Sequence, residues 1–142
     1  MTSKFSPIVK IKEQKLKDVE SSLAKARSEV NKAKQELELI IDQIKDLKVP
    51  QKGSISLLQL SHESLQSLQE QKRQKELFLS LCKQRVQEVL VEYKEANIEY
   101  EKMTHLHDVE IAKKLKHIKL LEQKELDEMS VVLYNLKKED DL

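Results

Sequence analysis

The residues in this chain that could do chemistry are few and poorly placed for it. The stretch THLHD, with His105, His107 and Asp108, comes nearest to a metal-binding pattern. On a helix, residues two apart point in roughly opposite directions, so the two imidazoles cannot share one ion. His62 and His117 are isolated in the sequence, and all four histidines are expected on a solvated surface.

The single cysteine and the single glycine also argue against catalysis. Cys82 falls between Leu79 and Val86 in an apolar stripe, where a cysteine is usually a small buried hydrophobe. One glycine cannot build a glycine-rich phosphate loop. The sequence therefore predicts no catalytic residue, no bound metal and no cofactor.

The composition instead indicates a few long helices. Charged residues make up 36% of the 142 residues and aromatic residues 4%, with one Gly and two Pro. So little Gly and Pro allows few turns, and Lys, Glu, Leu and Gln are the residues of long helices and coiled coils. We expect an all-α protein of one domain, residues 1–142.

The balance of charge gives no sign of a nucleic-acid or membrane partner. The formal net charge is +1, from 26 basic and 25 acidic residues. A lone cysteine fits a reducing compartment, and no run approaches the ~18 apolar residues that a membrane span needs. The N-terminus has no apolar signal region. We expect a soluble, cytoplasmic protein without direct membrane insertion.

The first predicted helix runs from about residue 7 to residue 48. Ser6 is its candidate cap, and Pro7 fits the first turn. Apolar residues follow one narrow stripe whose steps alternate between three and four, which is typical of a helix that packs on another helix. The stripe comprises Leu16, Val19, Leu23, Ala26, Val30, Ala33, Leu37, Ile40, Ile44 and Leu47.

The second predicted helix runs from about residue 57 to residue 138, with Ser54 or Ser56 as its cap. Two lysines, Lys72 and Lys75, interrupt its stripe, and we expect Leu77, Phe78 and Leu81 to replace them on the buried face. The alternative is a weakened stretch that a partner recognises. The stripe comprises Leu58, Ser61, Leu65, Leu68, Lys72, Lys75, Leu79, Cys82, Val86, Val89, Tyr93, Ala96, Tyr100 and Met103. After Met103 its phase slips.

Residues 49–56 form the predicted loop. Val49-Pro50 disfavours helix, and Gly53 can adopt the positive φ of a reversal, so we expect an antiparallel hairpin. The alternative is a kinked rod that dimerises in parallel. With Leu47 opposite Leu58, Val9 near the start of helix 1 lies opposite about Ala96 of helix 2. About 40 residues of helix 2 beyond that point have no partner in the chain. Such an overhang should fray, self-associate or enter another protein.

The overhang contains a basic patch, KKLKHIK, at residues 113–119. It has no interleaved aromatic residue for base stacking, and acidic residues follow closely, so nucleic-acid binding is disfavoured. Together with Ile111, Leu115, Ile118 and Leu121 it suits a partly acidic groove of a protein partner.

Two short stretches and this architecture resemble a known family. FSPIVKIKE (Phe5 to Glu13), a loop one third along the chain, and QKELDEM (Gln123 to Met129) resemble FliJ, the soluble coiled-coil component of the bacterial flagellar type III export apparatus. The YscO-like proteins are its counterparts in virulence secretion.

The resemblance implies a stalk, like the γ subunit of rotary ATPases, whose end with both termini lies in the pore of a hexameric export ATPase. The implied ATPase-binding residues are Phe5, Ile8, Ile11, Lys114, Lys116, Leu121, Gln123, Leu126, Asp127 and Glu128.

The resemblance also implies that the part near the loop reaches the cytosolic domain of the membrane export gate, and that export chaperones bind the chain. The best matching gate-binding positions are Glu36, Ile40, Gln43, Leu47, Ser61, Leu65, Leu68 and Lys72.

The sequence thus leads to a non-enzymatic adaptor that links the export ATPase ring to the gate, in the cytoplasm and peripheral to the inner membrane. A first rival interpretation is a structural coiled coil whose overhangs pair into an elongated homodimer. A second is a helical chaperone or nucleic-acid accessory protein that binds through KKLKHIK.

Overall fold

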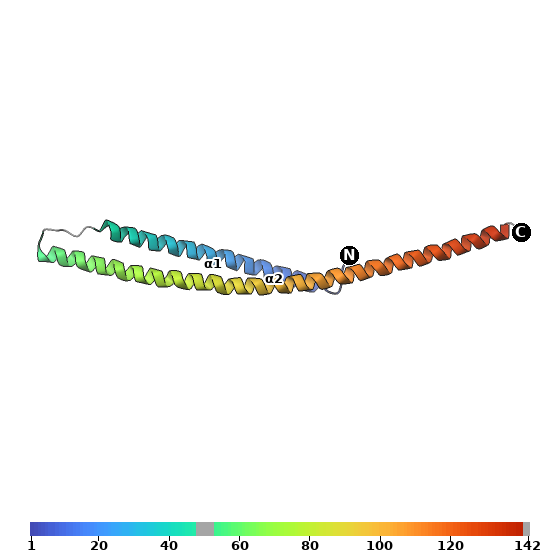
Figure 1. Cartoon of the computed structure of the whole chain (residues 1–142), viewed down its shortest axis with the longest axis horizontal. Helices are drawn as coiled ribbons and strands as arrows, with labels where there is room; N and C mark the ends of the chain where they lie inside the picture. Colours follow the sequence, from blue (N-terminus) through green and yellow to red (C-terminus); the bar gives the residue numbers. More distant parts are fainter. Residues whose placement is uncertain (48–52, 141–142) are drawn as a thin grey trace. The chain divides into compact units, whose positions relative to one another are not determined.

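The protein consists of two helices of very unequal length (Figure 1). The computed structural model describes residues 1–47 and 53–140. Helix α1 spans Ser6–Asp46 and helix α2 spans Ile55–Asp140, and the described residues contain no strand. The expected all-α hairpin with a much longer second helix is confirmed. The predicted end of helix 1 at residue 48 lies outside the described residues.

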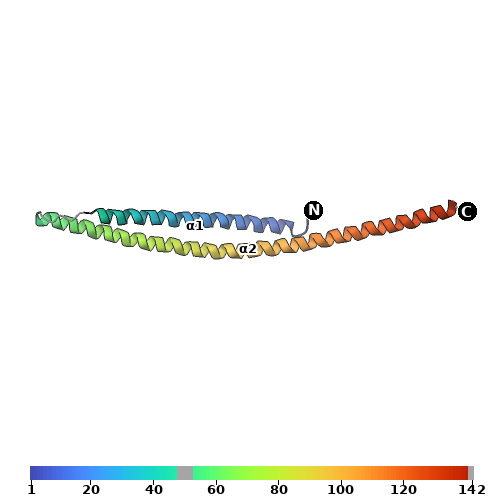
Figure 2. The ribbon, with the colours of Figure 1, turned by 45° about the horizontal axis from the view of Figure 1, so that its top comes forward.

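The two helices contribute to two compact units. Unit 1 comprises Met1–Gln14 and Ile98–Leu142, and unit 2 comprises Lys15–Asn97. Within unit 2, α1 and α2 run side by side in opposite directions in both views (Figures 1 and 2). The alternative of a single kinked rod is therefore wrong. The expectation of one domain stays a prediction.

Helix α1 is capped by Ser3 and not by Ser6. The Oγ atom of Ser3 accepts a hydrogen bond from Phe5 N at 3.1 Å, and Ser3 N donates to Ser6 Oγ at 2.9 Å. This exchange is a capping box, with serine in the place of the usual Glu or Gln. The carbonyl of Ser3 accepts from Ser6 N at 3.1 Å, which makes the missing N–H of Pro7 harmless.

Helix α2 is capped by Ser54, one of the two expected candidates. The N–H of Leu57 donates to Ser54 Oγ at 3.3 Å and to its carbonyl at 3.1 Å. The expected positive φ at Gly53 is absent, as at every other described residue. A Cβ added to Gly53 would lie 3.0 Å from Leu57 Cδ2, the flexible tip of a side chain. Neither the backbone conformation nor the surrounding space therefore requires glycine at this position.

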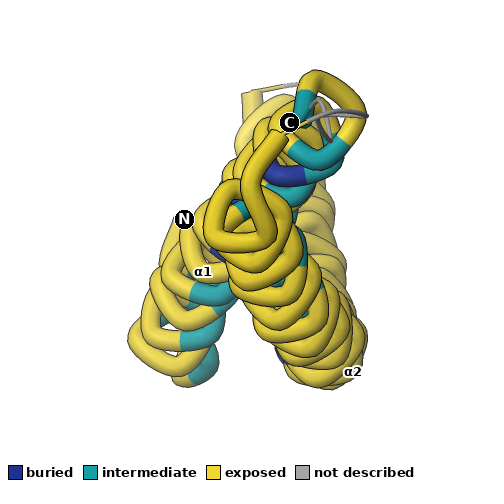
Figure 3. Tube along the Cα trace, turned by 90° about the vertical axis from the view of Figure 1, so that its left-hand side faces the viewer, coloured by how far each residue is buried: buried dark blue, intermediate teal, exposed yellow. Residues whose placement is uncertain are grey.

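The core of unit 2 is a thin line of residues along the two predicted stripes. Every stripe position from residue 16 to residue 47 is buried or half-buried, and on α2 only Leu58 is exposed. Exposed residues make up most of the chain (Figure 3). Small side chains in the core let the helices approach closely. The buried core residues are Leu23, Ala26, Ala33, Ile40, Cys82, Val89 and Ala96.

The register between the helices differs from the predicted one. In unit 2, Lys75 pairs with Glu36, where the predicted register placed Gln69. In unit 1, Lys12 pairs with Glu99, where it placed Tyr93. Both partners lie six residues further along α2, close to one heptad. A shift of one heptad leaves the same stripes facing each other, so the apolar pattern alone does not distinguish the two registers.

Lys72 and Lys75 keep their stripe positions, contrary to the expected local shift. Both are half-buried, and Lys75 Nζ lies 2.9 Å from Glu36 Oε2. Leu77, Phe78 and Leu81 are 60%, 50% and 63% exposed, so they do not replace the lysines. The aliphatic part of a lysine side chain packs along apolar surface while its ammonium group reaches solvent, which allows both residues to keep their stripe positions.

Candidate functional site

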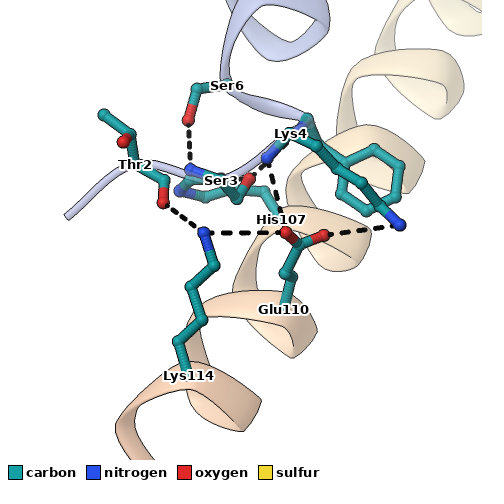
Figure 4. Close-up of polar contacts among 8 residues, drawn as sticks. Thr2, Ser3, Lys4, Ser6, His107, Glu110 and Lys114 are labelled. Atoms are coloured by element: carbon teal, nitrogen blue, oxygen red, sulfur yellow. Dashed lines mark hydrogen bonds and ion pairs between the residues drawn. The ribbon is translucent and has the colours of Figure 1, made fainter. Parts of the chain in front are cut away.

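The N-terminal residues of unit 1 are held against α2 by a set of polar contacts, here called the N-terminal clasp (Figure 4). Its members are Thr2, Ser3, Lys4, His107, Glu110 and Lys114. Ser3 is 8% exposed, and its Oγ lies 2.6 Å from His107 Nδ1. This partly buried hydrogen bond joins the cap of α1 directly to a side chain of α2.

Charged groups surround the Ser3–His107 contact. The Glu110 carboxylate accepts a hydrogen bond from Lys4 N at 3.4 Å, and the Lys4 and Lys114 ammonium groups lie 4.0 and 3.8 Å from it. Lys114 Nζ also donates to the carbonyl of Thr2 at 3.0 Å. The Lys4 ammonium lies 5.2 Å from the centre of the Phe5 ring. The two lysines are exposed while the Glu110 side chain is only 20% exposed, so each ion pair is partly solvated and contributes little alone, and the set orients the first residues of the chain.

The clasp corrects the expectation that His107 lies on a solvated face. His107 is half-buried against the N-terminal segment, whereas His105 is exposed. Within the described ranges, no group of His, Cys, Asp and Glu is arranged to hold a metal ion. Sequence reasoning missed the clasp because residues 1–5 have no periodicity, although Ser3 and Ser6 at capping-box spacing were a usable signal.

A groove of about 570 Å³ lies beside the clasp in unit 1. One carboxylate and two lysines line it together with one imidazole, so the groove is more basic than acidic. Its lining residues are Met1, Thr2, Glu110, Lys113, Lys114, His117 and Ile118. The KKLKHIK patch therefore borders the first residues of the chain through Lys113, Lys114, His117 and Ile118.

All of the residues that the family resemblance assigned to ATPase binding lie in unit 1. Phe5, just before α1, is half-buried, whereas Ile8 and Ile11 on α1 are 40% and 66% exposed. On α2, every assigned residue is exposed, and Lys114 belongs to the clasp. The structure thus places Lys114 in the clasp, with Phe5 beside it through Ser3 and Lys4, and leaves the later positions on α2 open to solvent.

The residues assigned to the export gate all lie in unit 2, and most of them pack between the helices. Ile40 is 7% exposed, and Leu47, Ser61, Leu65, Leu68 and Lys72 are half-buried. Only Glu36 and Gln43 are exposed, and Glu36 already pairs with Lys75. A partner that binds here contacts the polar residues that border the packed stripes and not the apolar residues between the helices.

Most of the exposed large apolar side chains of unit 1 lie on the last part of α2. Residues 112–140, here called the C-terminal segment, are helical and exposed throughout. Leu120, Leu126, Met129 and Leu133 are 56% to 64% exposed, and Tyr134 is 67% exposed. A soluble protein rarely leaves so many large apolar side chains in water unless they form a binding surface. No helix of the described chain is long and apolar enough to cross a membrane.

Comparison with known proteins places the chain in a family. Searches of curated proteins and of solved structures gave no match. The family model described as the flagellar FliJ protein matches residues 1–139, almost the entire length. The match includes α1, the clasp and nearly all of the C-terminal segment. The chain therefore belongs to the FliJ family of flagellar proteins.

Proposed function

We propose that this protein is the stalk-like adaptor between the flagellar export ATPase and the export gate. Membership of the FliJ family makes it a structural component of flagellar protein export and associates it with that apparatus. The role as an adaptor between the ATPase and the gate is our inference. The observation that carries it is the C-terminal segment, a long helix whose apolar side chains have no partner among the described residues.

The physical argument starts from the instability of such a segment. A single helix in water gains little from propensity alone, and most helices in proteins depend on packing of an apolar face. Residues 112–140 have that face, but no residue in the described ranges covers it. A ring with a central pore would surround the segment and contact more than one of its faces. Exposed apolar side chains on several faces, such as Leu120, Leu126 and Val131, fit that environment.

In this proposal the hexameric ATPase is contacted by Phe5, just before α1, and by Ile8 and Ile11 on α1. The exposed α2 residues that join them are Lys116, Leu121, Gln123, Leu126, Asp127 and Glu128. Lys114 contributes by holding the N-terminal segment in place through Thr2 and Glu110. The contacts are apolar at the centre and charged at the rim, as in other protein interfaces. The protein works in the cytoplasm at the inner face of the membrane, without inserting into it.

The same proposal assigns the gate contact to the polar side chains that border the packed stripes of unit 2. Glu36 and Gln43 are the exposed members of that set, and the half-buried Lys72 lies on the opposite helix. Export chaperones are expected to bind the chain as well. Binding of the isolated gate domain to Glu36→Arg and Gln43→Arg variants tests this part, with Glu38→Arg, also exposed on α1, as a control.

Steady-state ATP turnover of the hexameric export ATPase tests the main proposal. The full chain should stimulate turnover, and a chain ending at Lys119 should not. That cut keeps His107, Glu110 and Lys114, so the clasp survives, whereas an earlier cut would confound loss of the segment with loss of the clasp.

A point variant provides a second arm without shortening the chain. Leu121→Glu with Leu126→Glu should abolish stimulation, because both side chains are exposed and a charge there would be desolvated in the pore. Leu39→Glu, at a residue of α1 that is 62% exposed, is the matched control and should stimulate normally. Equal stimulation by all variants would contradict ATPase binding through this segment.

A further inference from the structure

The C-terminal segment has its charges in two separate blocks. Residues 113–119 contain four lysines and no acidic residue, and residues 122–128 contain four acidic residues and one lysine. The formal charge therefore changes from +4 to −3 within about four helical turns. This asymmetry is much larger than the net charge of +1 for the chain.

The two blocks are mirror images about the midpoint between Leu120 and Leu121. Each lysine of the first block has an acidic residue at the same distance on the other side, and Leu115 matches Leu126 in the same way. The matched charged pairs are Lys113 with Glu128, Lys114 with Asp127, Lys116 with Glu125, and Lys119 with Glu122. A helix with this pattern is complementary to an antiparallel copy of itself, whereas a parallel copy sets like charges side by side.

These charges are available for a partner. Apart from Lys114, none of the charged side chains in the two blocks forms an ion pair with any part of the chain that the structure describes. All of them are exposed. The apolar residues between them are exposed too, with Leu115 at 44%, Ile118 at 40% and Leu121 at 48%. An apolar stripe between complementary charges is the arrangement by which helices choose a partner and a direction.

We propose that the C-terminal segment binds a second copy of this chain in an antiparallel pair centred between Leu120 and Leu121. The two-fold symmetry makes each Lys–acid contact occur twice. Residues 129–136 of each copy then lie along residues 105–112 of the other, where Val109 is 38% exposed. The inference does not depend on the ATPase contact. Because both use the same segment, the dimer and the ATPase complex exclude each other, so self-pairing would protect the segment when the ring is absent.

Sedimentation of full-length chains with exchanged charges tests this pairing. One variant carries Lys113→Glu, Lys116→Glu and Lys119→Glu, and the other carries Glu122→Lys, Glu125→Lys and Glu128→Lys. Lys114 is left unchanged because it belongs to the clasp. The wild-type chain should dimerise with increasing concentration. Each variant alone should dissociate at least tenfold more easily, and an equimolar mixture should recover the dimer. Higher salt should weaken the wild-type dimer.

The control carries three lysine-to-glutamate changes at exposed positions of α1, Lys25, Lys32 and Lys45, and should dimerise like the wild type. A wild-type chain that stays monomeric at every soluble concentration overturns the proposal. So does a mixture of the two variants that fails to recover the dimer. Stimulation of the ATPase is measured separately, so its absence overturns the stalk proposal and leaves this one standing.

Cross-linking tests the direction of the pair. In the antiparallel pair, Leu121→Cys lies next to its copy, while two Met129→Cys residues are roughly 25 Å apart along the helices. Oxidation should link the first variant and not the second. The native Cys82 is buried in unit 2, so it does not compete. Efficient linkage through residue 129 would show a parallel pair and overturn the inference.

Discussion

Lys75 Nζ lies 2.9 Å from Glu36 Oε2, and this ion pair joins the two helices of unit 2 at a stripe position that an apolar residue would normally occupy. The side chains of Lys75 and Glu36 are 38% and 49% exposed, so the pair is partly solvated. Ion pairs with this exposure contribute less than about 1 kcal/mol. Its role is therefore to favour one register over another more than to add stability.

Replacing Lys75 by leucine should stabilise the hairpin. A buried leucine at the seam gains roughly 1 kcal/mol over lysine, which exceeds the loss of a solvated ion pair. We expect Lys75→Leu to raise the Tm by about 3 °C, measured by circular dichroism. Lys94→Leu, at an exposed position of the same helix, should leave the Tm unchanged. A lower Tm for Lys75→Leu would mean that the ion pair dominates.

Val89 and Val91 are a matched pair for measuring how much a core side chain contributes to the free energy of unfolding. Val89 is 1% exposed and Val91 is 55% exposed. Val89→Ala should lower the free energy of unfolding by about 2 kcal/mol, because it removes two methyl groups and leaves a cavity in a thin core. Val91→Ala should change it little, since alanine loses no burial there and favours helix. Chemical denaturation of the two variants checks this, and equal losses would place the core elsewhere.

Removing the Ser3 hydroxyl should loosen the N-terminal clasp. Ser3→Ala loses the helix cap on Phe5 N and the hydrogen bond to His107, a local cost of about 1 kcal/mol. Hydrogen exchange of the first amides of α1 should accelerate, while that of amides in the unit 2 core stays unchanged.

Two variants control the clasp prediction. Ser22→Ala removes an exposed hydroxyl that only bonds back to Asp18 O, so it should have no effect on these amides. A His107→Phe variant should share the effect of Ser3→Ala, and the double variant should add little, because both remove the same bond. Full additivity would show that the two residues act independently.

Glu70 should titrate at a lower pH than an ordinary glutamate. The hydrogen bond from Arg73, at 2.7 Å, is the main cause that lowers the pKa of Glu70 below 4.5. A carboxylate whose pKa is lowered in the folded state contributes stability above its unfolded pKa, and this contribution is lost as the pH falls through the folded value. The effect is small because both side chains are solvated.

NMR titration of the Glu70 carboxyl resonance measures this shift. Arg73→Gln should move the pKa of Glu70 back toward its ordinary value. The difference in Tm between the wild type and Arg73→Gln should be present at neutral pH and shrink as the pH falls through the folded pKa of Glu70, by the same linkage argument. Lys83→Gln, an exposed change at a distance along α2, should not move the Glu70 resonance.

The sequence by itself determined the helices and the faces that they bury. The apolar periodicity along stretches without glycine or proline predicted long helices, and the stripe from Leu16 to Leu47 is buried or half-buried as predicted. The stripe from Ser61 to Met103 is buried or half-buried too, but Lys72 and Lys75 stay on it, although the sequence predicts that Leu77, Phe78 and Leu81 replace them. The sequence also predicted the cap of α2 to one of two residues, Ser54 or Ser56, because capping depends on residues close by in the sequence, and the structure shows Ser54. The family assignment followed from two short stretches and this architecture.

Only the tertiary structure decided the register, the clasp and the environment of Lys75. A heptad pattern is unchanged by a shift of seven residues, so it does not distinguish the predicted register from one shifted by about a heptad, in which Glu36 pairs with Lys75, six residues beyond the predicted Gln69. The contact between Ser3 and His107 joins residues far apart in sequence and has no periodicity to reveal it. Periodic patterns specify which side of a helix is buried, but position along the helix depends on individual contacts with the partner, which exist only once the two helices have met.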